Sequence, residues 1–283
     1  MLISGSNQHY LPASLIGGFG VASKGRGLRE ATVAFRSIAT GNVYLDKAEN
    51  LAYRKDTYRL ENPPDGVDPD SIDNLWEPIE SELPGLINRL ENRCLGTDDD
   101  ERLFYYVATA VVRHPETFEA IARDHNLRNG FQIPVGDYLQ IERVEALLNQ
   151  LQLLPTWRWR VLHSTNDAPR LMITDRGWTC IGEDGWPSRG LFLPMSPRVA
   201  IFGYLDEDRL PLRRPPFEEH LYLCDSSIDW INSCAWTNED PYVNLLIAHP
   251  DDRNRLAGLP HYCDVKMNSY GPYRHRRSNG FFD

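Results

Sequence analysis

The side chains best suited to chemistry are a histidine, a glutamate, an arginine and an aspartate that lie far apart along the chain. They are His9, Glu80, Arg113 and Asp167. Imidazole and carboxylate groups transfer protons in acid and base catalysis, and both types also bind metal ions. A guanidinium group binds a phosphate or a carboxylate through two parallel hydrogen bonds. The combination suits the hydrolysis of a phosphodiester or another anionic substrate, because a cation would stabilise the negative charge that develops.

His9 lies in a segment, residues 7–20, in which three polar residues precede an apolar stretch closed by glycines. The polar residues are Asn7, His9 and Tyr10. Pro12 favours extended backbone before it, so the imidazole can face a pocket as a base or a metal ligand. A hydrogen-bonded structural histidine is the alternative.

Glu80 is expected to be partly buried. It follows Trp76 by four residues and precedes Leu83 by three, which places it at the margin of an apolar helical face. A carboxylate in that position requires a partner. Arg113 ends the apolar helix predicted over residues 103–112 and is a natural partner for Glu80 or for a substrate anion. The alternative role of Arg113 is to interact with the dipole at that helix end.

The central residues 70–154 are predicted to form a helical bundle. Apolar residues recur at steps of three and four over residues 72–90, where Pro84 can introduce a kink. Further helices are predicted to open at Thr97, at Glu116 and, capped by Asp137, to run to residue 154.

The flanking sections are predicted to be β structure. In the N-terminal section, residues 1–66, two short runs flank Gly41 and predict a hairpin. Residues 155–283 carry short runs separated by turns, which predict an antiparallel sheet; the runs are 157–162, 170–174, 178–181, 190–193 and 199–204, before a helix over 227–235 and a strand over 242–247. We expect an α+β fold in which the hairpin, the bundle and the sheet share one core in a single domain, residues 1–283.

Composition limits the classes of function and location. The formal net charge of −10 argues against a passive basic surface for nucleic acid. The dense basic groups are Arg213 with Arg214 and the tail at residues 273–277. Five scattered cysteines without a C-x-x-C pair favour a reducing cytoplasm over a disulfide framework or a zinc cage. Because residues 103–112 fall short of the roughly 20 apolar residues that span a bilayer, no membrane association is expected.

Short motifs relate the chain to a known family. They are NQHYLP from Asn7, WEPIE from Trp76, RHP from Arg113, TNDAP from Thr165 and LPMSP from Leu193. With these motifs the chain resembles a bacterial family catalogued as domain of unknown function 4238. Asn166 stands where serine is common in that family, so no role of the serine hydroxyl is carried over. The resemblance implies a cytosolic bacterial or phage-associated protein, acting in conflict between genomes.

The resemblance and the residue chemistry lead to two hypotheses. The first is a nuclease-like hydrolase of an anionic small molecule or a nucleic acid, compatible with a divalent metal ion. Its catalytic candidates are His9, Glu80 and Asp167, and its substrate-binding candidates are Asn7, Tyr10, Arg113, Ser196 and Asn232. The alternative is a non-catalytic binding or regulatory module in which these side chains form a structural network. A solvent-open cleft where they converge would favour the enzyme, and mutual pairing in the interior would favour the module.

Overall fold

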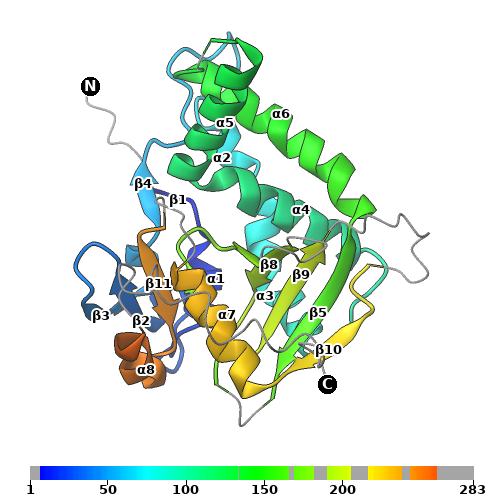
Figure 1. Ribbon diagram of the computed structural model, residues 1–283. Coiled ribbons are helices and arrows are strands. Elements are labelled where there is room, and N and C mark those ends of the chain that lie inside the picture. Colours follow the sequence, from blue (N-terminus) through cyan, green and yellow to red (C-terminus); the bar gives the residue numbers. More distant parts are fainter. Residues whose placement is uncertain are drawn as a thin grey trace.

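Helices in the middle of the chain pack against β-sheets built from both of its ends, as the ribbon of the computed structural model shows (Figure 1). The structure describes residues 7–132, 134–165, 169–181, 190–204, 216–237 and 243–259. The predicted α+β class is confirmed. Asp167, the two arginines at 213 and 214 and the tail at 273–277 lie outside the described residues.

The N-terminal segment is held by a short two-stranded sheet. Strand β1 (Asn7–His9) pairs antiparallel with β4 (Tyr53–Lys55), and the Tyr10 amide donates to the Ala52 carbonyl at 3.0 Å. Helix α1 (Ala13–Gly18) follows and packs against a 3₁₀ turn, η1 (Leu28–Glu30). Gly17 permits this contact, because a Cβ there would lie 1.9 Å from the Leu28 carbonyl oxygen.

A four-stranded antiparallel sheet contains strands from the N-terminal part and from the C-terminal part of the described chain. The predicted hairpin is present as β2 (Thr32–Ser37) and β3 (Val43–Lys47), with Gly41 at φ +69° in its turn. Strand β2 also pairs with β11 (Leu245–Ala248), which in turn pairs with β6 (Ile173–Thr174). The hairpin is therefore not a separate element, and the sheet brings residues near 245 beside residues near 35.

A five-stranded sheet forms the other β layer, in the order β10-β5-β9-β8-β7. Its strands are β5 (Arg158–Ser164), β7 (Thr179–Ile181), β8 (Gly190–Pro194), β9 (Val199–Tyr204) and β10 (His220–Leu223). The expected runs 157–162, 178–181, 190–193 and 199–204 pair antiparallel in this sheet, whereas the expected run 170–174 contributes β6 to the other sheet. Strand β10, which was not among the expected runs, lies parallel to β5 at one edge. Helix α7 (Asp225–Thr237) follows it.

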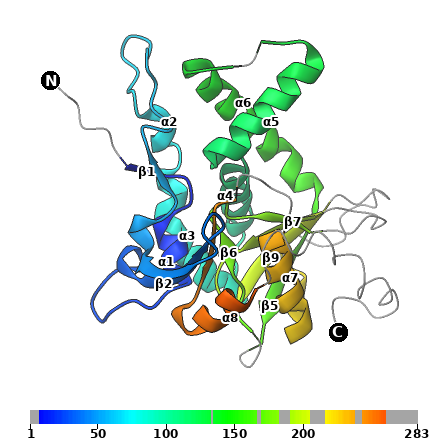
Figure 2. The same cartoon turned by 60° about the vertical axis from the view of Figure 1, so that its left-hand side comes forward.

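The helical section contains α2 (Ser71–Asn74), α3 (Glu77–Glu91), α4 (Asp99–Arg113), α5 (Pro115–Asn129) and α6 (Asp137–Leu153). The single helix expected over residues 72–90 is interrupted at Leu75 and Trp76, since Pro78 fits the first turn of a new helix and cannot donate in the interior of an old one. Pro84 lies within α3 without ending it. Figure 2 shows α5 and α6 extending away from the sheets.

The expected cap at the start of α6 differs from what the structure shows. The Asp137 carboxylate accepts hydrogen bonds from the backbone amides of Glu61 and Asn62 at 2.6 and 2.7 Å, and not from its own helix. The contact ties α6 to the loop before α2. Likewise, α4 begins after Asp98 and not at Thr97.

The main hydrophobic core draws on helices and strands together. It includes Leu15 of α1, Leu83 of α3, Val107 of α4 and Ile201 of β9, all fully buried. Burial of this shared apolar surface is the main force that holds the layers together. None of the helices in the described ranges has the length and hydrophobicity that a bilayer span requires.

Candidate functional site

The predicted site residues occupy separate places in the fold. Residues 9, 80 and 113 lie near the junction of β1, α3 and α4, whereas Ser196 follows β8 and Asn232 lies in α7. Asp167 is outside the described residues. The structure therefore brings together part of the predicted set.

Glu80 and Arg113 form an ion pair, as the sequence suggested they could. The Arg113 side chain is only 4% exposed and that of Glu80 is 26% exposed. The Arg113 guanidinium also lies 5.9 Å from the centre of the Tyr58 ring and 5.6 Å from that of Trp76, within the range of cation–π attraction. The cation is thus already matched by a carboxylate and two aromatic faces.

His9 is held by a backbone contact. Its Nε2 lies 3.1 Å from the Glu49 carbonyl oxygen, which can only accept, so Nε2 carries the proton in this contact. Burial lowers the pKa of His9, while the Glu49 carbonyl and the more distant Glu80 carboxylate raise it and Arg29 lowers it. The charge of Glu80 acts on the imidazole through space, but no hydrogen bond joins the His9 and Glu80 side chains. This favours the structural alternative for His9.

Arg143, which the sequence analysis did not select, completes this region. Its guanidinium donates to the carbonyls of Val112 and Arg113, and the Tyr58 hydroxyl donates to the Arg113 carbonyl at 2.7 Å. These donors satisfy carbonyls at the C-terminal end of α4, which have no partner within the helix. Arg143 falls in an apolar stripe of α6, a position from which its burial could have been suspected.

Ser196 and Asn232 both satisfy backbone groups. The Ser196 hydroxyl donates to the Glu91 carboxylate and accepts from the amides of Arg198 and Val199 at 3.1 and 3.2 Å. The Asn232 side chain accepts from the Met172 amide at 2.9 Å and donates to the Arg170 carbonyl at 3.0 Å. Their donors and acceptors are therefore used within the fold.

The described part of the predicted set does not fit a divalent metal ion. The His9 Nε2 contacts a carbonyl and Glu80 is paired with Arg113, which leaves no convergent ligands. Across the described ranges, no group of three His, Cys, Asp or Glu side chains is arranged to hold a metal.

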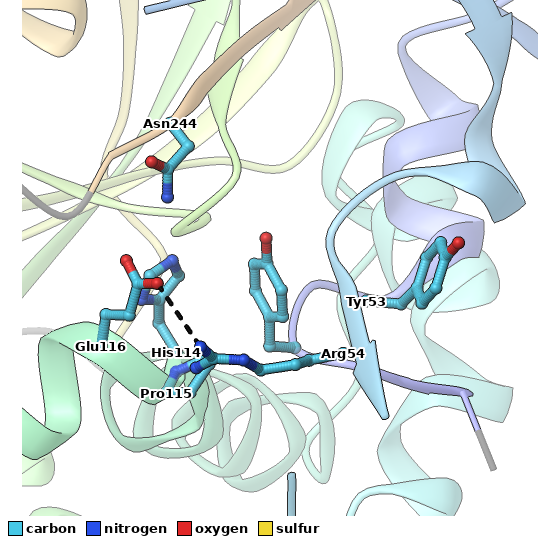
Figure 3. Close-up of a pocket in the computed structure, with 7 residues that line it drawn as sticks. Tyr53, Arg54, His114, Pro115, Glu116 and Asn244 are labelled. Atoms are coloured by element: carbon cyan, nitrogen blue, oxygen red, sulfur yellow. Dashed lines mark ion pairs between the residues drawn. The ribbon is translucent and has the colours of Figure 1, made fainter. Parts of the chain in front are cut away.

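A different location, between β4 and the start of α5, contains a small cavity of about 90 Å³ (Figure 3). It is lined by Tyr10, Tyr53, Arg54, His114, Pro115, Glu116 and Asn244. Of the predicted residues, Tyr10 is the one that lines it. The others come from the RHP motif, from β4 and from the segment before β11, so this cavity joins parts of the chain that are distant in sequence.

His114 lines the cavity and carries a buried hydrogen-bond donor. It is the N-cap of α5, and its Nδ1 accepts from the Thr117 amide at 3.3 Å. An amide can only donate, so Nδ1 keeps its lone pair and the neutral ring carries its proton on Nε2. His114 is 1% exposed, and its Nε2 has no partner among the described residues. A buried donor left in this state calls for a ligand or a water molecule.

The surroundings keep this imidazole neutral. Burial lowers the pKa of His114 to about 3, and the positive charges of Arg176, Arg143 and Arg54 add to the effect. The ring is therefore a neutral N–H donor near neutral pH in a positive field. Such a field favours an anion beside Nε2.

An acidic group lies beside His114 at the start of α5. Glu116, in the first turn of α5, pairs with Arg54 at 3.9 Å, and both side chains are about half exposed. Figure 3 shows this pair crossing the space in front of His114. Tyr10 lies 4.8 Å from the His114 ring, edge to face, and burial and the Asp175 and Glu116 carboxylates raise the pKa of its phenol. Tyr10 therefore stays protonated as a donor.

Asp175 holds one of the residues that line the cavity in place. It is fully buried, and its carboxylate accepts from the Asn244 amide at 3.1 Å. Burial raises the pKa of Asp175 to about 7, against the lowering effect of the amides of Asn244 and Leu245. The contact fixes Asn244, which lines the cavity, to the turn after β6.

The sequence analysis quoted His114 within the RHP motif but gave it no role, and it did not single out Glu116, Asp175 or Asn244. The signal for His114 was the Pro115 that follows it, since proline at the first helical position marks the preceding residue as an N-cap. No local signal marks Asp175 or Asn244, because β11 must pair before they meet the cavity.

A second hollow of about 570 Å³ lies beside α3 and the start of α4. Arg89 pairs with Asp99 at 2.7 Å and Arg102 with Glu82 at 2.6 Å, and none of the residues that line it has a buried polar atom without a partner, whereas His114 of the smaller cavity does. The smaller cavity is therefore the stronger candidate site.

Together, the layered helices and sheets and the cavity define an α+β protein with a neutral histidine beside a carboxylate. The chain belongs to the family described as "Protein of unknown function (DUF4238)", which matches residues 7–221. Tyr10, His114, Glu116 and Asp175 fall inside the matched range, and Asn244 lies beyond it. No curated protein and no solved structure matches the chain.

Proposed function

We propose that the protein is a hydrolase of an anionic substrate, a phosphodiester or another oxyanion ester, and that the reaction takes place in the cavity between β4 and α5. The observation that carries the proposal is His114, which lines the cavity, has a buried Nε2–H without a partner among the described residues, and lies in the field of three guanidinium groups. Neutral donors of this kind stabilise negative charge that develops on an oxygen in the transition state.

The carboxylate of Glu116 supplies the base. It takes a proton from water as the water oxygen bonds to the phosphorus or carbonyl carbon of the substrate. His114 Nε2–H and the Tyr10 hydroxyl donate to the oxyanion that forms. The bond to the leaving oxygen then breaks, and Glu116 returns the proton to that oxygen. Arg54, 3.9 Å from Glu116, keeps the carboxylate near the cavity and adds positive charge.

The test uses a variant that removes the ring and keeps the helix cap. Asn is among the best N-cap residues, so His114→Asn preserves an acceptor for the Thr117 amide while it deletes Nε2–H. We expect kcat on chromogenic phosphate and carboxylate esters to fall at least about 100-fold, the usual effect of losing one oxyanion donor. Glu116→Gln is expected to act similarly.

The matched control is His125→Asn, an exposed histidine of the same helix, which should keep full activity. Wild-type protein that hydrolyses none of the anionic esters, or a His114→Asn variant as active as wild type, would overturn the proposal.

A second candidate function is a non-catalytic binding or regulatory module. It is favoured by the pairing of Glu80 with Arg113 and by the backbone contacts of His9, Ser196 and Asn232. A module would bind its ligand without turnover, so calorimetric binding of an anion that the purified protein never converts would select this function.

The cellular setting belongs to the same proposal. Cys94 and Cys224 are exposed thiols outside any disulfide, which is consistent with a reducing cytoplasm. A bacterial origin and a role in conflict between genomes are supported by the family resemblance alone.

A further inference from the structure

We propose that residues 53–56, which we name the strap, open and close the cavity at the start of α5. The proposal rests on the proposed function in taking this cavity as the site, and it adds a way in which access to the site is regulated. It is carried by the exposure of the strap, by the small sheet that holds it, by the backbone at its two ends and by its contact with α5.

The strap is a surface segment between two buried residues. All four of its residues are exposed, whereas Ala52 before it is 5% exposed and Tyr58 beyond it is fully buried. The Ala52 carbonyl accepts from the Tyr10 amide at 3.0 Å, and the Tyr58 amide donates to the Gln8 side chain at 2.7 Å. Both ends are therefore anchored to the N-terminal segment, and the part between them can move as a unit.

The sheet that holds the strap is small. Residues 53–55 pair with residues 7–9 in the two-stranded sheet of β1 and β4. A two-stranded sheet is marginally stable by itself, because it makes few hydrogen bonds and buries little apolar surface. The strap can therefore separate from β1 while the two larger sheets stay intact.

Both ends of the strap have strained backbone. Ala52 and Asp56 each have a φ of +52°, in the left-handed region that a residue with a Cβ adopts reluctantly. They are two of the four non-glycine residues with positive φ in the described chain, and they flank this one strand. Strain at both ends lowers the cost of leaving the observed conformation, which marks Ala52 and Asp56 as hinges.

An ion pair connects the strap to α5 and acts as a latch. The Arg54 guanidinium lies 3.9 Å from the Glu116 carboxylate, and Figure 3 shows this contact beside His114. The two side chains are 53% and 40% exposed, so water and salt weaken the attraction. Such a contact favours the closed position without locking it.

Movement of the strap changes the entrance of the cavity. Tyr53 and Arg54 both line the cavity, which is open to solvent on one side. When the strap swings away, these two side chains leave and the entrance widens. When it closes, Arg54 returns its positive charge to the cavity. An anionic substrate can thus enter the open site and be retained by the closed one.

The experiment is amide hydrogen exchange of the full chain, measured without substrate. We expect the strap amides to exchange at least about tenfold faster than those of β2, after correction for intrinsic rates. Glu116→Gln removes the charge of the latch and should accelerate exchange in the strap about two- to fivefold, with β2 unchanged. The matched control is Glu119→Gln in the same helix, which should leave exchange in the strap unchanged. Added NaCl should accelerate the strap in wild type and have no effect on it in Glu116→Gln.

A pair of variants at one position tests the hinge. Asp56→Gly and Asp56→Ala remove the same charge and differ by one methyl group. Glycine adopts positive φ without strain, so Asp56→Gly should favour the closed strap and exchange at least about threefold more slowly than Asp56→Ala. Equal rates in these two variants overturn the proposal. So do strap amides that exchange as slowly as β2, or that Glu116→Gln leaves unchanged.

The outcomes separate the strap from the function. Because exchange is measured without substrate, its failure removes the strap and leaves the proposed function standing. A strap that opens as expected, in a protein that hydrolyses none of the anionic esters, would support the strap and refute the hydrolase.

Discussion

The Glu80–Arg113 region and the His114 cavity are adjacent along α4 and α5 and contain the same kinds of side chain, yet their states differ. In the first region the cation faces a carboxylate and two aromatic rings, and His9 contacts a carbonyl. In the second, the neutral His114 ring lines a cavity and has a buried donor without a partner, beside the half-exposed carboxylate of Glu116. Paired charges mainly stabilise a fold, whereas an unmatched donor beside a space can act on a ligand.

A buried polar atom without a partner does not by itself distinguish the His114 cavity from the Glu80–Arg113 region. Such atoms also occur around Arg113, at Gln8 Nε2, Thr57 Oγ1, Trp76 Nε1, Tyr106 OH and Arg113 Nε. None of these residues lines the cavity, and His114 does. The comparison therefore depends on the space next to the donor as well as on the missing partner.

The largest expected effect is on stability, from Arg113→Met. The change leaves the Glu80 carboxylate without its cation, and we expect the free energy of unfolding to fall by about 3–5 kcal/mol. Urea denaturation followed by circular dichroism measures it. The control is Arg128→Met, because the Arg128 side chain is 78% exposed and its pair with Asp124 should contribute less than about 1 kcal/mol. Equal losses in both variants would show that the first region is not a stabilising centre.

The next effect is a pH dependence that belongs to the cavity. The pKa of His114 is depressed from 6.5 to about 3, so the stability it contributes is present above pH 6.5 and is lost as the pH falls towards 3. Between pH 7 and pH 4 the loss is about 3 kcal/mol.

Unfolding of wild type and His114→Asn at the two pH values isolates this contribution. The pKa of His163 is also lowered, to about 4, but that effect is common to both proteins. The variant should lose about 3 kcal/mol less than wild type on acidification. The same pH dependence in both would mean that His114 is not kept neutral by the fold.

A smaller effect is expected for Asn232→Ala, which tests whether this predicted binding residue is structural. The Met172 amide would lose its buried acceptor, at a cost of about 1–3 kcal/mol, with kcat unchanged. Asn129→Ala, the same substitution at an exposed position, should cost less than about 0.5 kcal/mol. Loss of activity without loss of stability would show that Asn232 acts in substrate binding and not only in the fold.

The smallest effect is expected for His9→Asn, which removes the contact with the Glu49 carbonyl at a cost of about 1 kcal/mol. Steady-state kinetics should show kcat/KM unchanged, because His9 does not line the cavity. If this variant were inactive while His114→Asn kept its activity, the roles of the two regions would be exchanged.

The parts of the fold that follow from short-range patterns could be predicted from the sequence. The periodicity around Glu80 placed it at the edge of an apolar face, and the position of Arg113 after an apolar helix made it a partner. The hairpin around Gly41 followed from its turn residues. Strand β10 and the break before α3 were missed, because several conformations satisfy the same local pattern.

The sequence by itself determined the α+β class and most helix positions, and it named Arg113 as one possible partner of Glu80. These depend on periodicity, caps and turns, which act over a few residues. Tertiary structure alone decided that Asn244 and Asp175 support a cavity at the start of α5, because β11 must first pair with β2 and β6. It also decided that His114 keeps a donor free, since whether a polar atom finds a partner depends on the surfaces that meet around it.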